Sequence, residues 1–139
     1  MEILSTDTEL DITYKLNSLE LSVWLKHLNR LKKEINFLEK MITLDVDGQL
    51  GDDKVLQQLN SMMKQADTLS SKFKKYQHTK PDQNLCEDFK CDLDILKMHE
   101  LQRDSYLDYL NEYRLLKNRI HQLLYGRKAV VNIEALKYA

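Results

Sequence analysis

The clearest pattern along the chain is a heptad repeat between residues 21 and 42. Its a and d positions are all apolar, and most of the residues between them are polar or charged. This 3-4 spacing places the apolar side chains on one face of a helix, which must be buried against other helices. We expect Trp24 of this face to lie near Phe73 and Tyr76. The predicted core seam consists of Leu21, Trp24, Leu28, Leu31, Ile35, Leu38 and Ile42.

Capping and turn signals place the first two helices. Thr6 and Glu9 have the spacing of a capping box, and they predict a helix over residues 6–44. Gly48 and Gly51 mark a turn in the acidic stretch that follows. Asp52 suits the N-cap of a second helix, which we predict over residues 52–78.

Similar signals define the rest of the chain. Pro81 ends the second helix, and Asn84 with Glu87 forms another potential capping box. We predict a third helix over residues 84–125, Gly126 just past its end, and a short helical tail over residues 127–139. The predicted fold is all-α: an antiparallel three-helix bundle of long coiled-coil-like helices with a short C-terminal helical tail, in a single domain over residues 1–139.

Charge and cysteine content limit the classes of partner and compartment. The 21 basic and 22 acidic residues give a net charge of -1, so we expect no nucleic acid or anionic membrane as partner. The N-terminus has no basic region or long apolar run, so we expect neither a signal peptide nor a membrane span. On one helix Cys86 and Cys91 would face directions about 140° apart. Free thiols and a cytoplasmic location are therefore expected.

No metal or cofactor site is expected. Asp45, Asp47 and Gly48 fall in a partial EF-hand register, but Thr43 and Lys54 stand where the first acid and the bidentate Glu are needed. A ferritin-type di-metal centre requires Glu-x-x-His pairs, and none of the four histidines has a Glu three residues before it. We interpret the acidic stretch as a turn.

A polar stretch interrupts the apolar pattern of the third helix. It contains His99, Glu100, Arg103 and Asp104. Three interpretations are open: a phosphotransfer or acid–base site centred on His99, a buried polar layer, or a solvated helix surface. We expect the surface placement, with the apolar seam sliding onto Met98 and Leu101.

The far half of the third helix predicts an interface between copies of the chain. If the chain folds back about Gly48 and then about Lys80, contacting residue numbers sum to about 96 and about 160, which puts Tyr76 beside Glu20 and Tyr106 beside Lys54. Everything past Asp108 would then project by about 25 Å. We expect this projection to form a homodimer. Two alternatives are open: ordinary core packing of the three tyrosines, and a tail that folds back to cover the stripe with Val130, Ile133 and Leu136. The predicted interface residues are Tyr106, Tyr109, Tyr113, Leu116, Ile120 and Leu123.

Two segments resemble helical proteins of unknown function from flavobacteria and their relatives. They are VWLKHLNRLKKEINFLEKMI over residues 23–42 and DLDILKMHE over residues 92–100. Those proteins have a Trp-Leu start, a Lys-Glu-Ile-x-Phe-Leu helix and an Asp-x-Leu-Lys-His segment, whereas here Met98 stands between Lys97 and His99. The resemblance implies a bacterial cytosolic helical bundle and carries no activity with it.

Taken together, these patterns favour a non-enzymatic interaction or scaffold module that oligomerises or docks partner helices. The alternative is a small helical phosphotransfer or acid–base enzyme centred on His99. The surroundings of His99 discriminate between the two. An exposed and unpartnered imidazole argues against the enzyme, and a cleft shared with Glu100 and Arg103 supports it.

Overall fold

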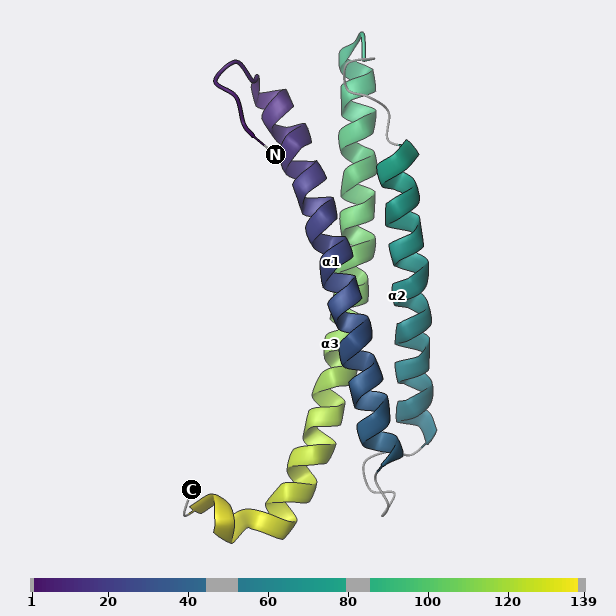
Figure 1. The fold of residues 1–139 in the computed structure, drawn as a ribbon, viewed down its shortest axis with the longest axis vertical. Coiled ribbons are helices and arrows are strands. Elements are labelled where there is room, and N and C mark those ends of the chain that lie inside the picture. Colours follow the sequence, from purple (N-terminus) through teal and green to yellow (C-terminus); the bar gives the residue numbers. More distant parts are fainter. Residues whose placement is uncertain (1, 45–52, 80–85, 138–139) are drawn as a thin grey trace.

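The computed structural model describes residues 2–44, 53–79 and 86–137, the last range without the side chains from residue 124 on. Three helices make up most of this part of the chain: α1 (Glu9–Thr43), α2 (Asp53–Thr79) and α3 (Phe89–Lys137). They lie side by side, and the C-terminal part of α3 bends away from the other two (Figure 1). The predicted all-α three-helix bundle is confirmed.

A continuous apolar core holds the three helices together. The predicted seam of α1 faces it, and full burial of each large apolar side chain contributes about 1.5–3 kcal/mol. Its buried members are Leu21, Trp24, Leu28, Leu31 and Ile35, while Leu38 and Ile42 pack against the core with partial exposure. The rings of Trp24 and Phe73 lie 5.3 Å apart between centroids, as the sequence predicted.

The start of α1 differs from the prediction by two residues. The side chain of Thr8, not Thr6, caps the helix: its Oγ1 accepts the Asp11 N–H at 3.1 Å, and the Asp11 carboxylate accepts the Thr8 N–H at 2.9 Å. Just upstream, the Asp7 carboxylate accepts the Leu4 N–H at 2.8 Å and closes a local turn. Because this turn occupies the chain before Thr8, the helix begins at the second of two potential capping boxes.

The start of α3 also lies further along the chain than predicted. The helix begins at Phe89, and the Asp88 Oδ1 accepts the Cys91 N–H at 2.8 Å. Glu87 therefore precedes the helix, so the predicted capping box is wrong at this position. Its other member, Asn84, lies outside the described residues.

Cys86 and Cys91 form a disulfide, with their Cα atoms 5.5 Å apart. The prediction of free thiols is wrong because it placed both residues on one helix. Cys86 instead precedes the first turn of α3, where the chain can bring it against Cys91. The two cysteines therefore give no support for a reducing compartment.

The C-terminal end of α3 differs as well. The helix continues through Gly126 to Lys137, so the predicted end at Gly126 and the separate tail over residues 127–139 are wrong. A glycine inside a helix costs about 1 kcal/mol relative to alanine, a cost that flanking helix formers can offset. The acidic turn that was compared with an EF-hand falls largely in residues 45–52, outside the described residues.

Contacts between α1 and α2 show that these helices are antiparallel in the predicted register. The residue numbers add to 97 for the Trp24–Phe73 ring contact and to 99 for the Lys32–Asp67 ion pair. Both sums are close to the predicted value of about 96, which follows from a turn near Gly48.

The register of α3 against α2 is different from the prediction. The residue numbers add to 179 for the Phe73–Tyr106 ring contact and to 171 for the hydrogen bond from the Tyr109 hydroxyl to the Met62 carbonyl. The prediction was about 160, and it placed Tyr106 beside Lys54. It is wrong because the contacts centre the turn near residue 87 instead of residue 80, and the later start of α3 at Phe89 accounts for part of this shift.

The shifted register places the predicted interface inside the core of the chain itself. Tyr106, Tyr109, Tyr113, Leu116 and Ile120 are all buried in the cluster formed with α1 and α2. Leu123 is 36% exposed and is the one predicted interface residue left outside that core. The expectation of a projection that starts after Asp108 is therefore wrong.

We predict that the double variant Cys86→Ser/Cys91→Ser unfolds more easily than the oxidised chain. The short cross-linked loop restricts the unfolded state, which stabilises the folded state by about 2 kcal/mol. Urea denaturation of both proteins measures the difference, and the wild-type chain with added reductant is the control. Rapid alkylation of both thiols in the untreated wild-type chain would contradict the disulfide.

Candidate functional site

Polar side chains of α1 and α3 meet at four levels along the bundle, and we call these contacts the polar seam. Its pairs are Tyr14–Asp92, Glu20–His99, His27–Tyr106 and Glu34–Tyr113. The two residue numbers differ by 78 in the first pair and by 79 in the other three. A constant difference means that α1 and α3 run parallel in one fixed register.

Sequence periodicity explains why these side chains meet. On α3 the members of the polar seam recur every seven residues, at positions 92, 99, 106 and 113. On α1 positions 20, 27 and 34 have the same spacing. Seven residues are close to two helical turns, so each set lies on one face of its helix. On α1 that face lies beside the apolar heptad, one position before Leu21, Leu28 and Ile35.

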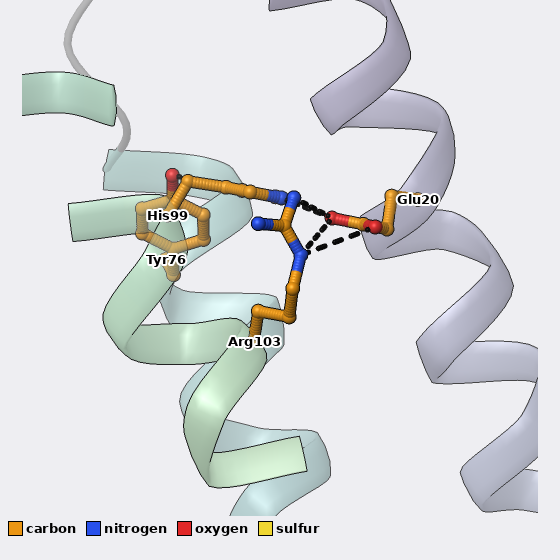
Figure 2. A network of polar contacts seen from close by, with 4 residues as sticks. All are labelled: Glu20, Tyr76, His99 and Arg103. Atoms are coloured by element: carbon orange, nitrogen blue, oxygen red, sulfur yellow. Dashed lines mark hydrogen bonds and ion pairs between the residues drawn. The ribbon is translucent and has the colours of Figure 1, made fainter. Parts of the chain in front are cut away.

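The centre of the polar seam is the imidazole of His99, which is only 1% exposed. Its Nε2 lies 2.7 Å from Glu20 Oε1, and its Nδ1 lies 3.4 Å from the Tyr76 hydroxyl (Figure 2). The ring stacks on Trp24, with 5.1 Å between centroids and 19° between planes. One residue of α3 thus contacts both α1 and α2 at a single level.

Arg103 completes this layer one helical turn further along α3. Its Nη2 donates to Glu20 Oε1 at 2.7 Å, and its Nε donates to the same oxygen at 3.1 Å. Burial alone would raise the pKa of the Glu20 carboxyl. Hydrogen bonds from Arg103 and His99 outweigh that effect and hold the pKa below its ordinary value. Glu20 is therefore an anion that accepts hydrogen bonds from two side chains.

The predicted surface placement of the polar stretch is wrong for His99, which is buried, whereas Arg103 reaches Glu20 of α1 with its side chain still 37% exposed. We expected the apolar face of α3 to continue through Met98 and Leu101 in this stretch. These two side chains are instead 42% and 65% exposed. Glu100 and Asp104 are exposed as predicted. His99 therefore occupies a buried position on the inner face of α3. Its imidazole can be buried there because both ring nitrogens have hydrogen-bonding partners, which offset the free-energy cost of removing them from water.

The lower part of the polar seam contains a second carboxylate. Glu34 Oε1 accepts the Tyr113 hydroxyl at 2.6 Å and the Lys117 ammonium at 2.7 Å. Burial alone would raise the pKa of Glu34, but these two hydrogen bonds lower it overall. Burial, followed by the Glu34 hydrogen bond, raises the pKa of Tyr113. Between the two carboxylates, the Tyr106 hydroxyl is hydrogen-bonded to His27 Nδ1.

The contact with Glu20 fixes one proton of His99. An ionised carboxylate can only accept, so Nε2 carries a proton toward Glu20, while Nδ1 contacts the Tyr76 hydroxyl. A carboxylate that orients an imidazole is also found in acid–base sites. Here the ring is enclosed, so a substrate could reach it only if α1 and α3 separated. Among the described residues, no three His, Cys, Asp or Glu side chains could together hold a metal ion.

Sequence reasoning singled out His99 and Arg103, and the predicted register placed Tyr76 beside Glu20, but it did not bring these two residues to His99. A signal for Glu20 was present, because polar residues recur every seven positions beside the apolar heptad of α1. For Tyr76 the contact with His99 had no separate signal, since its position in an apolar stripe is equally typical of a core aromatic residue that has no polar contact.

Comparisons with family models, curated proteins and solved structures find no match to this chain. Within the described ranges, no helix combines the length and apolarity needed to cross a membrane.

We predict that Glu20→Ala lowers the free energy of unfolding by about 2 kcal/mol. The variant leaves the buried imidazole of His99 without its acceptor and Arg103 without its counter-ion. Urea denaturation measures this loss. The free energy of unfolding should fall with urea concentration at the same slope in the variant and in the wild type. The matched control is Glu100→Ala, an exposed residue whose replacement should change stability by at most about 0.5 kcal/mol. Equal effects of the two variants would contradict the role of Glu20.

We also predict that acid weakens the bundle in two ranges of pH. Burial, followed by the charges of Arg30 and Arg114, lowers the pKa of His27 below 6.5. The unfolded state therefore takes up more protons below that pH, and the free energy of unfolding falls. Glu20 and Glu34 have pKa values below 4.5, so a further loss begins near pH 4.5 and continues as the pH falls.

The check is urea denaturation as a function of pH. The double variant Glu20→Gln/Glu34→Gln should lose most of the lower step and keep the upper one. A stability profile that is flat between pH 7 and pH 3 would contradict the assignment of both steps, since 6.5 and 4.5 lie within that range.

Proposed function

We propose that the protein is a non-enzymatic helical interaction module that acts through oligomerisation or through docking of a partner helix. The observation that carries this proposal is the length of α3. At the offset of 79 residues in the polar seam, Thr43 at the end of α1 is level with residue 122. Because α3 continues to Lys137, about 15 residues, or about 22 Å, extend past α1.

The sequence of this extension supports an interface. Val130, Ile133 and Leu136 recur at intervals of three residues, which is typical of one face of an amphipathic helix. Leu123, where the extension begins, is partly exposed. Two-fold pairing with a second copy is the commonest way to bury such a face, so a homodimer is the first form of this proposal.

The nature of the partner and its compartment belong to the same proposal. With a net charge of -1, the chain favours a protein over a nucleic acid or an anionic membrane as partner. The cytoplasmic location expected from the sequence competes with the Cys86–Cys91 disulfide, because disulfides persist mainly in oxidising compartments. The alkylation experiment above tests the disulfide, which is the observation that favours an oxidising compartment.

The alternative function is an acid–base or phosphotransfer enzyme centred on His99. The Glu20–His99 pair favours it, since a carboxylate partner increases the basicity of an imidazole. Burial of the ring argues against it, because phosphotransfer and general-base catalysis both require contact with a substrate. The interaction module is therefore the better-supported function.

We predict that the full chain is a dimer in solution, as measured by light scattering after size-exclusion chromatography. Leu136→Asp should shift it toward the monomer, because it places a charge on the apolar face of the extension. The matched control is Leu115→Asp, since Leu115 is 72% exposed on the bundle and its replacement should leave the dimer intact. A monomeric full chain would contradict the proposal, as would equal effects of the two variants.

A further inference from the structure

A second row of residues with heptad spacing follows the side of α1 that is turned away from the core. We call this row the outer face of α1. Neighbouring members are alternately three and four residues apart along its whole length. Its nine members, all of them exposed, are Leu16, Leu19, Val23, Lys26, Arg30, Lys33, Phe37, Lys40 and Leu44.

The position of the outer face follows from the buried seam of the same helix. Val23 and Arg30 each come two residues after a buried leucine, Leu21 and Leu28, which is a rotation of about 200°. Both rows have the same spacing, so the outer face stays opposite the core from one end to the other. At 1.5 Å per residue its length is about 42 Å, enough for a partner helix of eight turns.

The apolar members of the outer face lie outside the core of the bundle. Phe37 is 62% exposed and Leu44 is 76% exposed. Across the described part of α2, by comparison, no large apolar side chain is exposed in this way. Exposed apolar side chains that gather on one face mark a site of interaction.

The charged members of the outer face are all cations. None of its nine positions holds an acidic residue, although the chain as a whole has a net charge of -1. Within residues 2–44, 53–79 and 86–137, its lysines and its arginine take part in no ion pair. Their charge is therefore available to an acidic partner.

We propose that the outer face of α1 binds an amphipathic helix of another protein that is apolar at both ends and acidic in its middle. The order of residues along the row supports this chemistry: apolar side chains from Leu16 to Val23, cations from Lys26 to Lys33, then Phe37 and Leu44. A helix with the complementary order would cover the apolar ends and pair the central charges. This inference rests on the proposed function and specifies the chemistry of the docked helix.

Charge argues against a second copy of the chain as the occupant. An antiparallel two-fold pairing centred on Arg30 would place Leu16 opposite Leu44 and Val23 opposite Phe37, but it would also place Arg30 opposite itself. A parallel two-fold pairing would place every cation opposite its own copy. Both arrangements bring like charges together at the centre, which is unfavourable.

The placement of the cations also argues against an anionic membrane. A helix that lies in a membrane interface has its cations on the polar face and its apolar side chains on the other. Here Lys26, Arg30 and Lys33 occupy the row itself, between Val23 and Phe37. Insertion of the row into lipid would bury three charges, whereas an acidic helix would neutralise them.

The test titrates the full chain with a synthetic helical peptide of about 30 residues, long enough to span the face. One row of the peptide carries leucines at both ends and glutamates in the middle. The first control peptide has lysines in place of the glutamates, and the second has the same composition with the glutamates moved to one end. We expect saturable binding of the first peptide, at least tenfold tighter than of either control. Equal binding of all three, or no binding of the first, would overturn the proposal.

Charge-reversal variants locate the binding site. Arg30→Glu/Lys33→Glu should weaken binding of the glutamate peptide by about tenfold, because two ion pairs are replaced by repulsion. The same variant should bind the lysine peptide more tightly than the wild type does. The matched control is Lys64→Glu/Lys97→Glu, which makes the same change of charge at exposed positions of α2 and α3. An equal loss in the control would overturn the site, because it would show an effect of net charge alone.

A third pair of variants tests the apolar part of the face. Phe37→Ala should weaken binding of the glutamate peptide by about tenfold, since a large exposed ring would be covered by the partner. Leu115→Ala removes a side chain that is just as exposed on α3 and should leave binding unchanged. Equal effects of the two would overturn the proposed position of the partner.

Vesicles of phosphatidylcholine and phosphatidylserine test the membrane. Vesicle binding that Arg30→Glu/Lys33→Glu abolishes, without binding of the glutamate peptide, would overturn the proposal in favour of a lipid surface. Dimerisation is measured separately by light scattering, and the charge-reversal variant should leave it unchanged because the extension of α3 is intact. A dimer that binds no peptide overturns this inference alone, and a monomer that binds the glutamate peptide overturns only the dimer.

Discussion

Burial of the His99 imidazole is the constraint on which the alignment of the helices depends. The ring can stay in an apolar core only while its nitrogens have partners, and these come from two different helices: Glu20 on α1 and Tyr76 on α2. A shift of α3 by one residue would rotate the ring by about 100° and remove both contacts. One side chain of α3 thereby fixes the position of α3 against both neighbours.

The apolar core could not fix this alignment alone. Leucine and isoleucine recur with the heptad, so a slip of one full heptad would bury a similar apolar surface. The polar seam distinguishes the two registers. A slip of seven residues would bring either Asp92 or Tyr106 opposite Glu20 in place of His99. Asp92 would oppose a like charge, and neither replacement reproduces the donors of His99 and Arg103, so the observed register is favoured.

This division of roles explains which features the sequence could predict. The apolar heptad of α1 and the contact between Trp24 and Phe73 follow from helical periodicity, which any long amphipathic helix shows. The start of α3 does not, because several Asx and acidic residues near position 88 could each cap a helix. Each residue by which the centre of the turn moves changes the sum of contacting residue numbers by two, and the observed shift, to which the later start of α3 contributes, moved Tyr113 from a supposed projection into the core. The partners of His99 depend on that same register.

The structure also separates what folding uses from what remains for binding. His99, Glu20 and Glu34 form hydrogen bonds within the bundle. Their polar groups hold the helices in register and are therefore not available to a partner. What remains for a partner is the outer surface of the bundle, where apolar side chains such as Phe37, 62% exposed, lie outside the core. A partner that docks there would leave the hydrogen bonds of the polar seam intact, since those bonds lie between the helices.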